Sequence, residues 1–130
     1  MGNEITKFGS NTTFTLTPDL AVRKDDAWGP FNRFPGFTFS AVTMSRDALH
    51  DGERHPDGDE IVYVVSGRIE VAIEAGRERV VQVGAGEGVV IPTGVWHKVR
   101  VLELGQLVTV SPGPGFEFRP LKGGRSSAPL

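Results

Sequence analysis

The 130-residue sequence contains no cysteine, and this absence removes several kinds of chemistry. Disulfide bonds, thiolate nucleophiles and cysteine-ligated zinc or iron–sulfur sites are all excluded. A domain of this length buries enough apolar surface to fold without such cross-links. The lack of cysteine also fits a cytoplasmic location, which we expect for this protein.

The sequence also lacks an excess of basic residues. Its 14 Lys and Arg residues are outnumbered by 16 Asp and Glu residues, for a formal net charge of −2. A dedicated nucleic-acid-binding protein carries a basic patch, so we expect no nucleic-acid partner. No apolar run reaches the length needed to span a bilayer, and we expect no membrane association.

A helical pattern of apolar residues is missing as well, because Gly or Pro interrupts every long segment in which one might form. The 17 Gly and 9 Pro residues instead separate short segments rich in β-branched and aromatic residues. This pattern predicts about nine to eleven short strands. So many strands in one domain predict an all-β fold, either a sandwich or a barrel, in which closure of the sheet removes exposed edges.

The middle of the chain predicts two hairpins. Residues 61–65 (IVYVV) are apolar throughout, which predicts a strand buried on both faces. Residues 68–73 (RIEVAI) alternate between apolar and polar, which predicts a half-covered strand. Ser-Gly at 66–67 is predicted to join them as a hairpin, and Ala-Gly at 75–76 to start a second one. Further separate strands are predicted at VVIP, KVRVLEL and QLVTV.

Side chains of the kind that bind metals gather in two short stretches. Glu53 and His55 are two residues apart, so in an extended chain they point the same way. Glu60 stands at the start of the next strand, and His97 follows a later turn that contains Pro and Gly. We predict that His97 points inward. Two imidazoles and two carboxylates form a site suited to one divalent Fe, Mn, Zn, Ni or Co ion.

The spacing of these stretches resembles that of the cupin superfamily. The first family motif, G-x5-H-x-H-x3-4-E-x6-G, is similar to Glu53-x-His55-x4-Glu60-x6-Gly67. The second, G-x5-P-x-G-x2-H-x3-N, is similar to Gly86-x5-Pro92-x-Gly94-x2-His97-x3-Val101. The resemblance covers about residues 37–111. It implies an antiparallel double-sheet β-barrel of the cupin or jelly-roll type over residues 1–118, followed by a flexible tail at residues 119–130.

Three positions depart from the family pattern. Glu53 stands where the first His of the first motif belongs, and Asp47 stands where its opening Gly belongs. Val101 replaces the final Asn of the second motif.

The resemblance implies that His55, Glu60 and His97 are metal ligands. The role of Glu53 has two alternatives: it is a fourth ligand, or it is an unligated general base whose pKa is raised by the apolar barrel. His50 is the other candidate to complete the site, but it lies outside the motif spacing, and we predict that it is an exposed loop residue.

Aromatic residues are candidates for contact with a substrate. We predict this role for Trp96 and Phe39. Trp28, Phe31 and Phe34 lie in a segment that is a loop by composition. These three either line a pocket or belong to the core, and the core is the more common place for aromatic residues in a small barrel.

These features together predict a metal-dependent enzyme that acts on a small oxygenated organic substrate in the mouth of a barrel. A hydroxy-carbonyl, enol, sugar or phenolic compound fits this class. Dioxygenase, isomerase, lyase and cyclase reactions all stay open, because the cupin fold hosts each of them. The alternative is a non-catalytic module that binds or senses a small molecule. We also expect a homodimer that pairs through the N-terminal strands.

Overall fold

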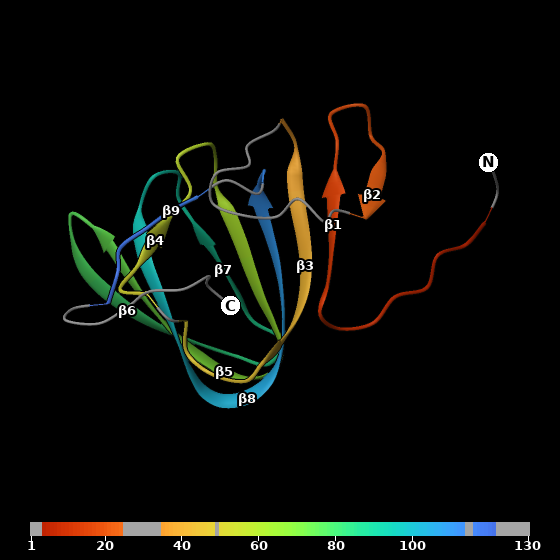
Figure 1. Cartoon of the computed structure of the whole chain (residues 1–130). Coiled ribbons are helices and arrows are strands. Elements are labelled where there is room, and N and C mark those ends of the chain that lie inside the picture. Colours follow the sequence, from red (N-terminus) through yellow and green to blue (C-terminus); the bar gives the residue numbers. More distant parts are fainter. Residues whose placement is uncertain (1–3, 25–34, 49, 114–115, 122–130) are drawn as a thin grey trace.

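The computed structural model describes residues 4–24, 35–48, 50–113 and 116–121, which form nine β-strands and no helix (Figure 1). No helix in these ranges is therefore long and apolar enough to cross a membrane. Trp28, Phe31 and Phe34 lie outside the described residues, as do residues 122–130 of the predicted tail. The strands are β1 (Thr12–Leu16), β2 (Val22–Lys24), β3 (Phe37–Met44), β4 (Glu53–Arg54), β5 (Glu60–Ala75), β6 (Arg77–Gly84), β7 (Gly88–Ile91), β8 (Trp96–Pro112) and β9 (Glu117–Phe118).

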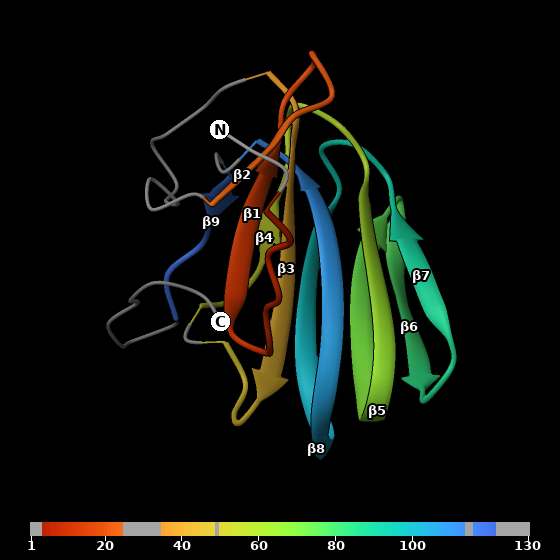
Figure 2. The same ribbon diagram turned by 90° about the vertical axis from the view of Figure 1, so that its right-hand side faces the viewer.

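Two long strands, β5 and β8, connect the two walls of a curled sheet (Figures 1 and 2). One wall has the strand order β2-β1-β3-β8-β5-β7 and uses the second half of β8 and the first half of β5. The other wall has the order β9-β4-β8-β5-β6 and uses the remaining halves. Every strand pair is antiparallel, as a cupin-type double-sheet barrel requires. The predicted all-β fold class is confirmed.

Strand β5 bends at residues 66–67, where the sequence predicted a hairpin. Strand β5 continues through these residues, with register shifts against β8 between Val64 and Ile69. Gly67 has a φ of 83°, and a Cβ atom there would lie 2.6 Å from the carbonyl oxygen of Leu104. Glycine is required at such a close approach. The predicted hairpin was wrong, because the Ser-Gly pair forms a β-bulge that bends the strand without reversing it.

Strand β8 shows the same effect. KVRVLEL and QLVTV are parts of one strand rather than two. Gly105 separates them, and a Cβ atom there would overlap the carbonyl group of Ser66 on β5. The hairpin predicted at residues 75–76 is present, because Ala75 pairs with Arg77 across the β5–β6 turn.

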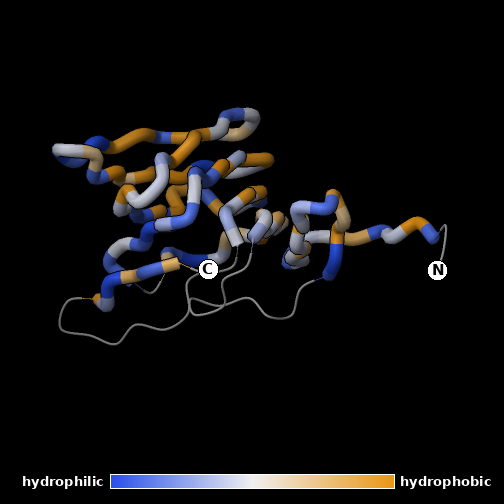
Figure 3. The backbone as a smooth tube through the Cα atoms, turned by 90° about the horizontal axis from the view of Figure 1, so that it is seen from above, coloured by the Kyte–Doolittle hydropathy of each residue, from blue (hydrophilic) through white to orange (hydrophobic). Residues whose placement is uncertain are grey.

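The hydrophobic core lies between the two walls, and the hydrophobic stretches follow the strands of the curled sheet (Figure 3). In the first half of β5, Val62 and Val64 point into this core. Ile61, Tyr63 and Val65 point outward and are 48%, 43% and 52% exposed. The prediction that residues 61–65 are buried on both faces was therefore wrong. The core consists of Met44, Val62, Val64, Ile69, Val71, Ile73, Val83, Ile91 and Leu107.

Candidate metal centre

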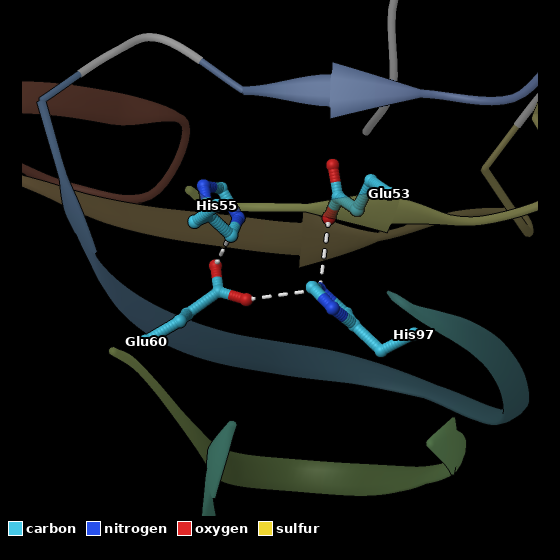
Figure 4. A group of neighbouring side chains, drawn as sticks. All are labelled: Glu53, His55, Glu60 and His97. Atoms are coloured by element: carbon cyan, nitrogen blue, oxygen red, sulfur yellow. Dashed lines mark ion pairs between the residues drawn. The ribbon is translucent and has the colours of Figure 1, made fainter. Parts of the chain in front are cut away.

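Four acidic and imidazole side chains from separate parts of the sheet meet inside the barrel (Figure 4). Glu53 lies on β4 and His55 follows it, whereas Glu60 begins β5 and His97 lies near the start of β8. One nitrogen or oxygen atom from each residue lies within 4.8 Å of the others. The structure thus brings together the four residues that the sequence predicted, and His97 points inward as expected.

The turn before β8 joins the two stretches that carry these residues. The backbone N–H of Gly94 donates to the carbonyl oxygen of His55 at 2.9 Å. The carboxylate of Asp59 accepts hydrogen bonds from the N–H and the hydroxyl of Thr93, at 2.8 Å and 2.7 Å. These bonds hold the later turn against the earlier loop, so the rings of His55 and His97 stack with their centroids 5.7 Å apart.

The carboxylates lie close to imidazole nitrogens, as the dashed lines of Figure 4 mark. Glu60 Oε1 is 3.2 Å from His97 Nε2, and Glu60 Oε2 is 3.4 Å from His55 Nε2. Glu53 Oε1 is 3.4 Å from His97 Nε2. The side chain of Glu53 is 19% exposed and that of Glu60 is 7% exposed, so Glu53 lies at the open side of the group.

The backbone fixes which nitrogen of His97 faces the carboxylates. Its Nδ1 lies 3.1 Å from the carbonyl oxygen of Val95. A carbonyl oxygen only accepts hydrogen bonds, so Nδ1 carries a hydrogen. In the neutral ring, Nε2 then has a free lone pair directed toward Glu60. This is the tautomer that a metal ligand needs, with its second nitrogen held by the protein.

Burial and the neighbouring carboxylates act in opposite directions on the imidazoles. Burial lowers the pKa of His97, but Glu53 and Glu60 outweigh it and raise that pKa to about 10. Burial also lowers the pKa of His55, and Glu60 more than offsets this, so the net shift is upward. Burial raises the pKa of the Glu60 carboxyl, but the two imidazoles hold it well below its usual value. A proton thus occupies the place that a cation would take.

The buried polar atoms provide a test of whether a metal ion fits. Among the described residues, the buried side-chain nitrogens and oxygens without a hydrogen-bond partner are all on histidines: His50 Nε2, both nitrogens of His55, and His97 Nε2. Buried polar groups in folded proteins nearly always have a partner. A divalent ion between His55, His97 and the two carboxylates would satisfy one nitrogen of each ring. Two nitrogen and two oxygen donors suit Fe, Mn, Zn, Ni or Co, so the donor set fits.

His50 is buried, and the prediction that it is an exposed loop residue was wrong. It is 1% exposed, and burial lowers its pKa against the opposing effect of Glu53. The segment around it is covered by the C-terminal segment. The N–H of Asp51 donates to the carbonyl oxygen of Arg119, and the N–H of Arg119 donates to that of Gly52, each at 2.8 Å. Motif spacing contains no information about a contact so remote in sequence.

A cavity of about 340 Å³ is lined by three of the four residues, Glu53, His55 and Glu60. One wall carries hydroxyl groups, because Thr13, Ser40 and Thr109 are direct neighbours across β1, β3 and β8. Nearby, the hydroxyl of Ser111 donates to Glu60 Oε2 at 2.6 Å. The wall also includes apolar side chains, namely Ala41, Val42, Ala48, Val62, Val99, Leu107 and Phe116. The cavity therefore suits a small molecule with both oxygen atoms and an apolar part.

The structure does not bring Phe39 and Trp96 to this cavity. Phe39 lies between two residues of β3 that line the cavity, so its ring faces outward, with its centroid 6.0 Å from that of Phe8. Trp96 lies outside the cavity as well. The guanidinium carbons of Arg54 and Arg119 lie over its ring, 4.9 Å and 4.5 Å from the ring centroid.

Phe116 is the aromatic residue that sequence reasoning missed. It lines the cavity, and its ring centroid is 6.1 Å from that of His55. It lies far beyond both motifs in the chain, so their spacing contained no signal for it.

Comparisons with known proteins agree with this architecture. The cupin domain family matches residues 42–113, which is more than half of the chain. The structure of an oxalate oxidase in complex with the substrate analogue glycolate is similar, with a TM-score of 0.53 and 26% identity over 63% of this chain. The match spans only 45% of the oxalate oxidase chain.

Two further solved structures show the same fold. A cupin-2 domain containing protein from Shewanella frigidimarina NCIMB 400 has a TM-score of 0.50 and 26% identity, over 68% of this chain and 83% of its own. Procruciferin, an 11S globulin from Brassica napus, has a TM-score of 0.51 at 16% identity, over 65% of this chain and 22% of its own. A search of curated proteins gave no significant match to the sequence.

Proposed function

The chain belongs to the cupin family, and we propose that it is a metal-dependent enzyme that acts on a small oxygenated organic substrate. The observation that carries this proposal is the convergence of Glu53, His55, Glu60 and His97 to within 4.8 Å, directly beside a cavity. In the proposal, His55, Glu60 and His97 hold one divalent Fe, Mn, Zn, Ni or Co ion. When bound, the ion supplies Lewis-acid chemistry at a substrate oxygen.

The protein's own residues orient the proposed ligands. The carbonyl group of Val95 holds the ring of His97, and the hydroxyl of Ser111 holds one oxygen of Glu60. Such outer contacts fix the direction of ligand lone pairs and tune the affinity for the ion. The apolar part of the wall, including Phe116 and Leu107, limits access of water to the reacting groups.

Glu53 is the carboxylate best placed to exchange a proton with a substrate. It is the more exposed of the two, and its contact within the group runs through Oε1 to His97. We propose that Glu53 would be the fourth ligand of the ion; an unligated Glu53 would instead be the base that accepts a proton from the substrate. Glu60, held by Ser111 and close to both imidazoles, is the fixed carboxylate of the site.

The cavity wall supports an oxygenated substrate. The row Thr13, Ser40 and Thr109 offers hydroxyl groups that both donate and accept hydrogen bonds. A similar oxalate oxidase is known in complex with the substrate analogue glycolate, which is a small oxygenated molecule. We therefore propose hydroxy-carbonyl, enol, sugar or phenolic compounds as substrates.

Metal analysis of the purified protein tests the proposal. We expect about one divalent ion per chain after reconstitution in wild type, and its loss in His97→Ala. Glu53→Gln removes a carboxylate of the site. Its control is Glu78→Gln, on the exposed face of β6, which removes a carboxylate of the same size outside the site. Reconstituted wild-type protein that takes up no Fe, Mn, Zn, Ni or Co would contradict the proposal. Full metal content without turnover of phenols, diketones and sugars would favour the binding or sensing module instead.

We also propose that the protein is a homodimer, on a different basis from the N-terminal strand edges. The outer face of the first wall carries a continuous apolar row in cross-strand register, and Ile61 and Val90 within it are 48% and 61% exposed. Phe8 of the same chain packs against Phe14, which is 8% exposed, and against Phe39. A two-fold dimer would cover the exposed end of the row at Ile61 and Val90. Light scattering that shows a monomer would contradict this. The row is Phe14, Phe39, Val110, Ile61 and Val90.

A further inference from the structure

His50 is a buried polar side chain that has no part in the metal site described above. It lines the same cavity as three of the four candidate ligands, Glu53, His55 and Glu60, and is 1% exposed. Within the described part of the chain its Nε2 has no hydrogen-bond partner, although Glu53 Oε2 lies 3.8 Å away. A buried N–H without a partner costs about 1–3 kcal/mol, so a partner is expected in the working state of the protein.

The backbone determines which nitrogen of His50 carries the hydrogen. The N–H of Gly52 donates to His50 Nδ1 at 3.0 Å. Only an unprotonated nitrogen accepts a hydrogen bond, so the ring is neutral and its hydrogen lies on Nε2. His97 has the opposite tautomer, because its Nδ1 faces the carbonyl oxygen of Val95.

This tautomer excludes His50 from direct coordination and makes it a donor. A metal-binding nitrogen needs a free lone pair, and the Nε2 of His50 has none. Moving the hydrogen to Nδ1 would set it against the N–H of Gly52. His50 therefore presents an N–H group to the cavity, on the side where Glu53 lies.

We infer that His50 is a positioning residue that holds Glu53 as the fourth metal ligand. Its Nε2–H donates to Glu53 Oε2, while Oε1, which lies 3.4 Å from His97 Nε2, turns to the ion. The present 3.8 Å separation is longer than a hydrogen bond, and a shift of less than about 1 Å closes it. The side chain of Glu53 is 19% exposed. The inference rests on the proposed metal site and specifies how its fourth ligand is fixed.

A pair of substitutions separates the donor function of His50 from its contact with Gly52. Asn at position 50 places an acceptor oxygen close to where Nδ1 lies but does not reach Glu53. Gln is one carbon longer and places an amide N–H near the position of Nε2. The measurement is Co²⁺ affinity, followed by visible absorption in competition with a chelator. Loss of an outer hydrogen bond to a metal ligand typically weakens metal affinity about 10–100-fold. We expect a loss in this range for His50→Asn and a smaller loss for His50→Gln.

A double-mutant cycle tests whether His50 acts through Glu53. His50→Phe is expected to weaken Co²⁺ binding in the wild-type background and to have no further effect in Glu53→Ala. A merely structural role predicts the same loss in both backgrounds. Thermal melting of the metal-free variants identifies any that are misfolded, and the Asn and Gln pair keeps the test valid if the Phe variant is one of them.

The outcomes distinguish the inference from the proposed function. Wild type that binds Co²⁺ with His50→Asn unchanged overturns the inference alone. A loss in His50→Phe that persists in full in Glu53→Ala also overturns it, as does His50→Gln binding more weakly than His50→Asn. Wild type that takes up no Co²⁺ overturns the proposed metal site, and the inference with it.

Discussion

Raising the pH is expected to tighten metal binding steeply, because the ion must displace a proton from His97. In the metal-free protein, burial lowers the pKa of His97, but Glu53 and Glu60 outweigh it and raise the pKa to about 10. The ring is therefore protonated at neutral pH, whereas a metal ligand must be neutral. Binding then releases this proton, and affinity rises with pH until about pH 10.

The size of the effect follows from the pKa. While one proton is displaced, the apparent association constant rises about tenfold per pH unit, or about 1.4 kcal/mol. Between pH 6.5 and 8.5, Co²⁺ binding is thus expected to tighten at least about 100-fold from His97 alone. Burial lowers the pKa of His55, but Glu60 outweighs it, so the net shift is also upward.

Calorimetric titration with Co²⁺ in buffers of different ionisation enthalpy measures the number of protons released. We expect at least about one per ion at pH 7.5, because the raised pKa of His97 keeps its ring protonated there. Glu53→Gln removes one of the two carboxylates that raise the pKa of His97, so its affinity should level off at a lower pH than that of wild type. An affinity that does not change with pH, with no proton release, would refute the account of the site.

Three other outcomes follow from the structure. The folded-state pKa of His97 lies above its ordinary value of 6.5. Protonated His97 therefore contributes up to about 4–5 kcal/mol to the free energy of unfolding. This contribution is complete below pH 6.5 and is lost as the pH rises toward 10. Chelator-treated protein should accordingly melt at lower temperature at pH 9 than at pH 6.5, and a flat or rising profile would contradict the ion pairs. Gly76→Ala should lower the free energy of unfolding by about 1–2 kcal/mol, because its φ is positive but no atom lies near the added Cβ. Gly67→Ala should lower it by more than about 3 kcal/mol, because its Cβ would meet the carbonyl group of Leu104. Equal chemical denaturation midpoints for the two variants would refute the role of the bulge. Ile61→Lys should give a monomer by light scattering, while Val80→Lys, on the exposed face of β6, should not, and a dimer in both would exclude the apolar row as the interface.

The cluster of Glu53, His55, Glu60 and His97 was predictable because each of its members lies in a local pattern. Glu53 and His55 share an extended segment, and Glu60 and His97 each follow a loop rich in Pro and Gly. Turn residues fix the direction in which a strand leaves a loop, so the side chain at its start has a defined orientation. The hydrogen bond from Gly94 to His55 then joins the two stretches. Four correctly spaced residues were therefore enough to place the site.

The remaining errors concern contacts between segments that are remote in sequence. A Ser-Gly pair is compatible with a hairpin or with a bulge, and the pairing of β5 along β8 decided for the bulge. His50 is buried because the segment around Arg119 covers its loop. The substrate contact of Phe39 stays a prediction, and its position in β3 places it on the opposite face from Thr38 and Ser40.

The alternation of side chains along β3, β5 and β8 links the proposed chemistry to the proposed assembly. In this wall the inner face carries Ser40, Thr109 and Glu60, whereas the outer face carries Phe39, Val110 and Ile61. Phe8 of the same chain packs against Phe39, whereas Ile61 at the other end of the row is 48% exposed. A barrel with a closed core has no need of a hydroxyl row inside. Both patterns are accounted for if the inside binds an oxygenated molecule and the outside binds a second copy. A shift of one residue in the β3–β8 register would exchange the two faces, so the hydrogen-bond register that builds the cavity also places the apolar residues of the proposed interface.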